Sequence, residues 1–182
     1  MTHSFRSALV VAVAAATLAA AVTRVSRESM RAMEISFDKR IQTIAVDNPF
    51  ELLGNTRGVY LDNYGAVFTA EVNLQHSATI SPFMLTIPKG YAAKLRQSKL
   101  SRLPVVRQNM QEEMLAMAAS LDGVPPKEQI VLGVTLYYHK WEETNGLPAQ
   151  IVMRAERQKL LDVQLGGTDR SSLDSIIRVD EQ

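Results

Sequence analysis

The side chains best suited to chemistry lie in a short His-Lys-Trp-Glu-Glu segment. His139, Glu142 and Glu143 place an imidazole three and four residues before two carboxylates, and such a set can bind a metal ion if the segment forms a helical turn. These residues are too few to complete a metal site by themselves, and His76 is the candidate for a further ligand. The sequence has no HExxH pair. We therefore expect no resident metal or cofactor, and interpret the segment as a polar strand end whose Trp141 covers the core.

Serine, histidine and acidic residues are all present, so a hydrolytic triad is a second candidate chemistry. A triad is defined by geometry, however, and the sequence has no G-x-S-x-G or similar nucleophile turn. This pattern favours a binding protein, and a small extracytoplasmic hydrolase or metal-dependent enzyme is the alternative prediction. A pocket in which His76 or His139 meets two carboxylates would favour that alternative.

The middle of the chain is strongly basic. No acidic residue occurs between Glu71 and Glu112. The stretch carries six positive charges, on Lys89, Lys94, Arg96, Lys99, Arg102 and Arg107. The four from Lys94 to Arg102 are candidate contacts for anionic lipid headgroups, acidic glycans or an acidic protein face. The simpler interpretation, which we favour, is a solvated helix face neutralised by acidic residues nearby in space.

Aromatic side chains gather at two predicted loop ends. Tyr64 lies in the first predicted turn, and Tyr137, Tyr138 and Trp141 crowd the end of a later strand. Aromatic residues at such ends are good contact groups for sugars or proteins, although core packing explains most of them equally well. Exposure of Tyr64 and Trp141 on one edge would favour a binding role, whereas burial of both would remove it.

Two predicted β-hairpins must position these residues. Gly58–Leu61 and Ala66–Leu74 are β-branched and aromatic runs on either side of an Asp-Asn-Tyr-Gly turn. Alternate residues of the second arm are apolar, which predicts one core face and one partly wet face. Gln129–His139 has two apolar faces and is predicted to be a central strand, with Pro148–Arg154 as its hairpin partner.

Helical periodicity predicts the elements that cover this sheet. Ser26–Ala45 is expected to be a half-buried helix. Lys89–Leu121 is expected to form two helices with a break at Pro104. The methionine-rich stripe of the second one is interpreted as core rather than as a binding groove. Ala155–Val163 is a further predicted helix.

The N-terminus predicts export. A short start with one fixed positive charge, Arg6, precedes 15 residues that are apolar apart from Thr17. This run is shorter than the roughly 20 residues of a transmembrane helix, so a cleaved signal peptide is favoured over a retained anchor or a buried helix. Cleavage is expected between Ala21 and Val22, with an earlier cut after Ala16 as the alternative.

Composition narrows the function classes further. With Arg6 removed from the total of 20, the mature chain has 19 Lys and Arg against 19 Asp and Glu. So balanced a charge argues against nucleic acid as a partner. The chain has no cysteine, which excludes disulfides and a lipid-modified leader and leaves burial as the source of stability.

Together these patterns predict an α+β fold, in which an antiparallel or mixed sheet built from two β-hairpins is covered by helices on at least one face. We expect a signal peptide at 1–21, one domain at 22–165 and a flexible tail at 166–182. The predicted protein is an exported, periplasmic or secreted, binding or envelope-associated interaction module. Its expected partner is an unknown protein or envelope component, and no stable transmembrane span is expected after cleavage.

Overall fold

The computed structural model describes residues 25–44, 49–77 and 86–182, so the predicted leader and its cleavage site lie outside the described residues. The elements in chain order are α1 (Arg27–Thr43), β1 (Glu51–Leu52), β2 (Arg57–Leu61), β3 (Gly65–Asn73), α2 (Tyr91–Ser120), β4 (Gln129–Leu136), β5 (Gln150–Glu156), α3 (Arg157–Gln164), the 3-10 helix η1 (Arg170–Ser172), α4 (Leu173–Ile176) and β6 (Arg178–Glu181).

The strands form one mixed sheet. The strands lie in the order β1, β3, β4, β5, β6. Strand β2 also pairs with β3: β1 pairs with Val72 and Asn73 of β3, and β2 pairs with residues 65–69 of β3. Strands β3 and β4 are parallel, and α2 makes the long crossover that a parallel pair requires. The other pairs are antiparallel. The predicted α+β class is therefore confirmed, and β4 lies between β3 and β5 as the central strand.

The first predicted hairpin is present as β2 and β3. The two strands pair from Arg57 opposite Thr69 to Leu61 opposite Gly65, and Asn63 in the turn has a φ of 63°. A Cβ on Gly65, whose φ is 137°, would lie 1.9 Å from the carbonyl oxygen of Gln129. Only glycine allows the turn to approach the start of β4 so closely.

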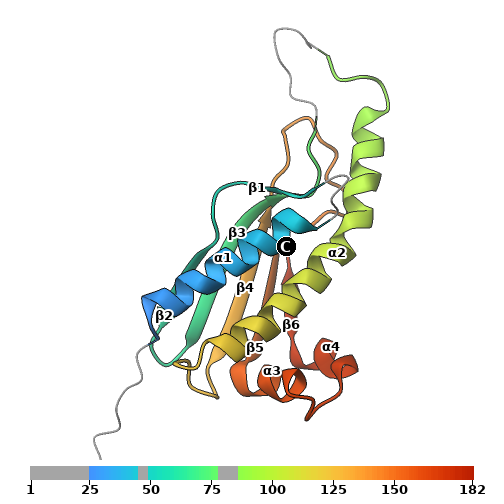
Figure 1. The fold of residues 1–182 in the computed structure, drawn as a ribbon. Coiled ribbons are helices and arrows are strands. Elements are labelled where there is room, and N and C mark those ends of the chain that lie inside the picture. The colour runs from blue at the N-terminus through green and yellow to red at the C-terminus, as the bar shows by residue number, and fades with distance from the viewer. Residues whose placement is uncertain (1–24, 45–48, 78–85) are drawn as a thin grey trace, which may run out of the picture.

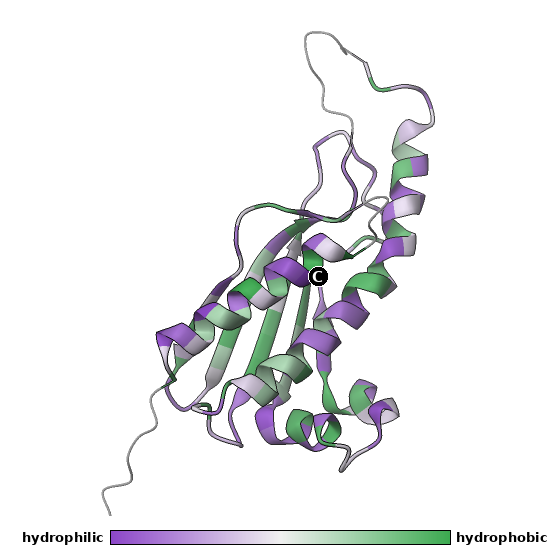
Figure 2. Cartoon of the chain, viewed as in Figure 1, coloured by the Kyte–Doolittle hydropathy of each residue, from purple (hydrophilic) through white to green (hydrophobic). Residues whose placement is uncertain are grey.

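Helices α1 and α2 cover one face of the sheet (Figure 1). Alternate residues of β3 face them and are buried, from Ala66 and Phe68 to Val72. The central strands are mostly hydrophobic beneath helices of mixed polarity (Figure 2). The opposite face has no helix over it within the described part of the chain, and Thr69, Glu71 and Thr135 are exposed there.

The long helix α2 differs from the predicted pair of helices, because Pro104 lies inside it and does not end it. Buried side chains recur at helical spacing on both sides of Pro104, which itself faces solvent. Packing of this continuous stripe on the sheet offsets the missing amide hydrogen bond. The methionine stripe is core, as predicted, and Met110, Met114 and Met117 are fully buried.

The C-terminal segment differs from the predicted flexible tail. Strand β6 pairs with β5 from Arg178 opposite Arg154 to Glu181 opposite Ile151. The preceding turn buries Leu173 and Ile177 against the core. This segment, rich in Ser, Asp and Arg, is thus held by two buried apolar side chains and by pairing with the edge of β5. The sequence alone does not predict that pairing.

Candidate functional site

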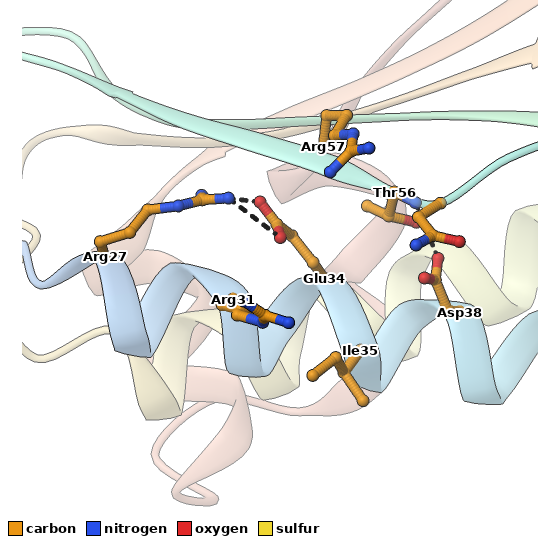
Figure 3. A pocket seen from close by; sticks show the side chains of 8 residues that line it. Arg27, Arg31, Glu34, Ile35, Asp38, Thr56 and Arg57 are labelled. Carbon is orange, nitrogen blue, oxygen red and sulfur yellow. Dashed lines mark hydrogen bonds and ion pairs between the residues drawn. The ribbon is translucent and has the colours of Figure 1, made fainter.

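A small polar cleft lies between α1 and the edge strand β2 (Figure 3). Its volume is about 150 Å³. The lining residues are mostly charged or polar: Arg27, Arg31, Glu34, Ile35, Asp38, Asn55, Thr56 and Arg57. Three arginines and two carboxylates therefore meet in one place, and their roles differ.

The two carboxylates of the cleft attach α1 to the sheet. Glu34 accepts hydrogen bonds from the backbone N–H of Gly58 at 2.9 Å and from the Arg27 guanidinium at 2.7 Å. Asp38 accepts one from the backbone N–H of Thr56 at 2.9 Å. These backbone amides belong to the edge strand β2 and to the residue just before it. The carboxylates therefore accept hydrogen bonds that a neighbouring strand would otherwise accept.

The ionised form of Glu34 is the stabilised one. Burial by itself would raise the pKa of Glu34, but the hydrogen bonds from Arg27 and Gly58, with the charges of Arg27 and Arg57, hold it below its ordinary value of 4.5. The carboxylate is almost fully buried, so it serves as a fixed structural anion.

Close approach of α1 to β2 depends on Gly58. A Cβ at this position would lie 2.6 Å from the ring of Phe68 and 2.9 Å from the terminal methyl of Met30. The absence of a side chain lets Met30 on α1 pack over the strand, and this packing fixes the width of the cleft.

The remaining polar groups of the cleft make no side-chain hydrogen bond or ion pair in the described part of the chain, although the charge of Arg57 acts on Glu34. Within the described residues, neither the Arg31 nor the Arg57 guanidinium makes a hydrogen bond or ion pair, and Figure 3 shows them on opposite sides of Glu34, one on α1 and one on β2. The Thr56 hydroxyl is buried and has no hydrogen-bond partner in the same part of the chain. Unsatisfied buried hydroxyls are rare and call for an explanation.

The basic segment predicted as a patch is divided among several roles. Lys99 is fully buried and lies 2.6 Å from Glu142, which is also buried. Arg102 lies over the Phe50 ring at 4.2 Å, and Arg96 donates to the carbonyl of Asn145. Lys94 is exposed. Lys99 is thus not available as a surface contact, and the other three do not form a bare basic face.

The predicted aromatic residues lie at opposite ends of the sheet. Tyr64 is 42% exposed in the turn between β2 and β3, beside the first residue of β4. Trp141 lies in the loop five residues after the end of β4 and is half-buried, stacked on His139 with ring centroids 5.8 Å apart. They do not share an edge, so they do not form the joint contact surface that we considered.

The predicted catalytic and metal-binding groups come together incompletely. His76 and His139 line one pocket with Glu51, but Glu142 pairs with Lys99 instead. No group of three histidine or acidic side chains that could hold a metal ion occurs among the described residues. The Ser77 hydroxyl donates to Glu142 and not to a histidine, so these residues do not form a hydrolytic triad.

Comparison with known proteins gives no further guidance: no family model, no curated protein and no solved structure matches this chain. Across residues 25–44, 49–77 and 86–182, no helix has both the length and the apolar character that a membrane crossing needs.

The cleft was missed by the sequence analysis, although a signal for it exists. Arg27, Arg31, Glu34 and Asp38 follow one another at spacings of four, three and four, which places them along one side of a helix. This charged row borders the apolar row of α1. Its partners Thr56 and Arg57 come from the sheet, however, and no local pattern connects the two segments.

Proposed function

We propose that this chain is an exported binding module that takes a small oxyanion in the cleft between α1 and β2. The observation that carries the proposal is the pair Arg31 and Arg57, which line one cleft and make no hydrogen bond or ion pair in the described structure. A guanidinium presents a planar set of donors that matches carboxylate and phosphate oxygens.

The two carboxylates of the cleft do not prevent the proposed anion binding. Glu34 and Asp38 are already engaged with backbone amides, and three arginines exceed them by one positive charge. The volume of about 150 Å³ limits the bound group to a small one, such as a phosphate, a sulfate or a carboxylate.

The enzymatic alternative has less support. A hydrolase or a metal-dependent enzyme needs convergent acids and bases, and the histidine pocket has one carboxylate among its lining residues, Glu51. A binding role needs no such convergence. The proposed partner is therefore an anionic group carried by a small molecule or by an envelope component.

The binding proposal is tested by titrating the protein with phosphate, sulfate and acetate in low-salt buffer by isothermal calorimetry. We expect saturable binding of at least one anion, and the three arms distinguish tetrahedral from planar ligands. Arg31→Ala and Arg57→Ala should each weaken it at least about tenfold, since a charge-assisted hydrogen bond contributes about 1.5–3 kcal/mol.

The matched control is Arg178→Ala, which removes an exposed arginine on β6 whose ion pair is with Asp180. Its titration should match that of the unchanged protein. Absence of saturable binding for all three anions would contradict the proposal, and so would an equal loss in Arg178→Ala and Arg31→Ala, because it would indicate nonspecific screening of surface charge.

Export is the second part of the proposal, and its support is the N-terminal sequence pattern. Intact mass spectrometry of the chain recovered from soluble and envelope fractions of a bacterial host tests it. We expect a soluble mature chain that begins at Val22. A full-length mass in the membrane fraction would contradict cleavage and indicate a retained anchor.

A further inference from the structure

A second pocket lies beyond the last residues of β3 and β4. Its volume is about 320 Å³, and it shares no lining residue with the cleft between α1 and β2. Glu51 and Leu53 line it from the segment of β1, Asn73 and His76 from the end of β3, and Tyr137 and His139 follow β4.

The polar groups of this pocket are one carboxylate together with amide, hydroxyl and imidazole groups among the described lining residues. The Glu51 carboxylate accepts from the amide of Asn73 at 3.0 Å, and the same oxygen lies 3.3 Å from Nδ1 of His76. The second carboxylate oxygen has no hydrogen bond within the described residues, and neither has Nε2 of His76 or of His139. A carboxylate oxygen and two ring nitrogens therefore remain for a ligand.

Aromatic rings continue from one wall of the pocket. Tyr137 and His139 meet edge to face with ring centroids 5.1 Å apart. The Tyr137 hydroxyl also lies 3.3 Å from Nδ1 of His139, within hydrogen-bond distance. His139 stacks on Trp141, and the ring of Trp141 lies next to that of Tyr91, with centroids 5.8 Å apart. Tyr137 and His139 are the members of this series that line the pocket, and the Tyr137 ring supplies its aromatic surface.

This combination excludes most ligand classes. A metal ion lacks three suitable side chains in the described part of the chain, and an anion would be repelled by Glu51. A purely apolar ligand would cover the carboxylate and the imidazoles without offering them a hydrogen bond, which is unfavourable. A neutral ligand that offers several hydroxyl groups and one flat apolar side satisfies both the polar groups and the rings.

We infer that this pocket binds a sugar ring, with its hydroxyl groups on Glu51 and the two histidines and its apolar side against Tyr137. A site of 320 Å³ falls in the range of small-ligand pockets, about 300–1,000 Å³. The inference does not depend on anion binding at the cleft, because the two sites have no residue in common.

The chain contains a convenient reporter for this pocket. Trp141 is its single tryptophan and stacks on His139, which lines the pocket. The experiment is a fluorescence titration of the purified mature protein with glucose, N-acetylglucosamine and their β-1,4-linked disaccharides. We expect a saturable change in Trp141 emission for at least one saccharide, together with a rise in melting temperature.

Variants make this test specific. Glu51→Ala should weaken saccharide binding at least about tenfold, and Glu51→Gln, which keeps the size and one acceptor, should weaken it less. Glu71→Ala, an exposed carboxylate on the open face of the sheet, is the control and should bind normally. The double variant Arg31→Ala/Arg57→Ala should also bind saccharide normally, so failure of the anion proposal and failure of this one can be told apart.

The inference is overturned if no saccharide changes the emission or the melting temperature. It is also overturned if the change survives unaltered in Glu51→Ala, because the ligand would then lie elsewhere. Because Glu51 is 40% exposed, its replacement is expected to leave the fold intact, and the urea midpoint of each variant checks this.

Discussion

Lys99 and Glu142 lie inside the molecule, whereas Arg31 and Arg57 border an open cleft. The inner pair is 2.6 Å apart and almost completely buried. Lys99 also donates to the carbonyl of Tyr137 and lies over the ring of Tyr138. The two arginines have no such contacts in the described structure, so cations of the same formal charge are paired inside the molecule in one region and exposed in the other.

The difference shows that the role of a charge follows from its partners. A buried charge is stable only when it is paired and hydrogen-bonded, so Lys99 cannot be removed without leaving Glu142 uncompensated. An exposed guanidinium is well hydrated and costs little to keep or to lose. Substitution of matched residues can therefore separate structural charges from charges available for binding.

The largest expected effect is at the inner pair. Lys99→Met should lower the free energy of unfolding by about 3–5 kcal/mol, because it leaves a buried carboxylate without its partner. Lys94→Met, five residues earlier on α2 and exposed, should change it by less than about 0.5 kcal/mol. Urea unfolding measures both. Equal losses of unfolding free energy in the two variants would refute the distinction. Adding Glu142→Gln to Lys99→Met should restore part of the stability.

The next largest effect sharpens the comparison within a single helix. Arg40 on α1 donates to the buried carboxylate of Glu113 at 2.8 Å, whereas Arg31 on the same helix faces the cleft. Arg40→Met should cost about 2–3 kcal/mol, below the full value for a buried pair because Arg40 is partly exposed. Arg31→Met should cost less than about 0.5 kcal/mol. A stability loss in Arg31→Met equal to that in Arg40→Met would show that Arg31 is structural.

Glu34 gives a pH-dependent test of the structural part of the cleft. Its pKa is lowered on folding, so its stabilisation is complete above the pKa of an unfolded glutamate and is lost as the pH falls through the folded value. Glu34→Gln should cost about 2 kcal/mol at neutral pH, and the difference from the unchanged protein should shrink on acidification. Urea midpoints across this range measure it, with the exposed Glu28→Gln as control. A difference that stays constant with pH would contradict the role of the charge.

The smallest expected effect is at Tyr60. Burial and the hydrogen bond to Glu128 raise the pKa of Tyr60 to about 12. Its contribution to stability is therefore complete below the ordinary tyrosine pKa of 10.0 and is lost as the pH rises through the folded value. Tyr60→Phe should cost about 1 kcal/mol. The ultraviolet difference titration of the two proteins should show the missing phenol ionising near pH 12, and a missing transition near 10 would contradict the assignment.

Most helices and the inner strands were predictable from periodicity. The apolar rows of α1, β3 and β4 repeat at helical or strand spacing, and such patterns are local. Pro104 was misleading, because the cost of a proline in a helix is local whereas the packing that offsets it comes from the sheet. Strand β6 was missed because its four residues carry no strand pattern of their own and depend on β5.

The candidate sites were less predictable than the fold. The sequence singled out His139 and Trp141, which do lie together beside a pocket. It also placed Lys99 on a basic surface, where the structure shows a buried ion pair. The cleft was not predicted, since Thr56 and Arg57 meet α1 only through tertiary packing.

By itself, the sequence determined the class of fold, the apolar faces of its long elements and the absence of disulfides, because these depend on residue type and on spacing along one segment. Tertiary structure decided which charges are paired and which are free, because that depends on distances between segments far apart in the chain. Glu142 reaches Lys99 from a loop beyond β4, and β2 brings Arg57 to Arg31. The two proposed sites exist only in the folded chain for this reason.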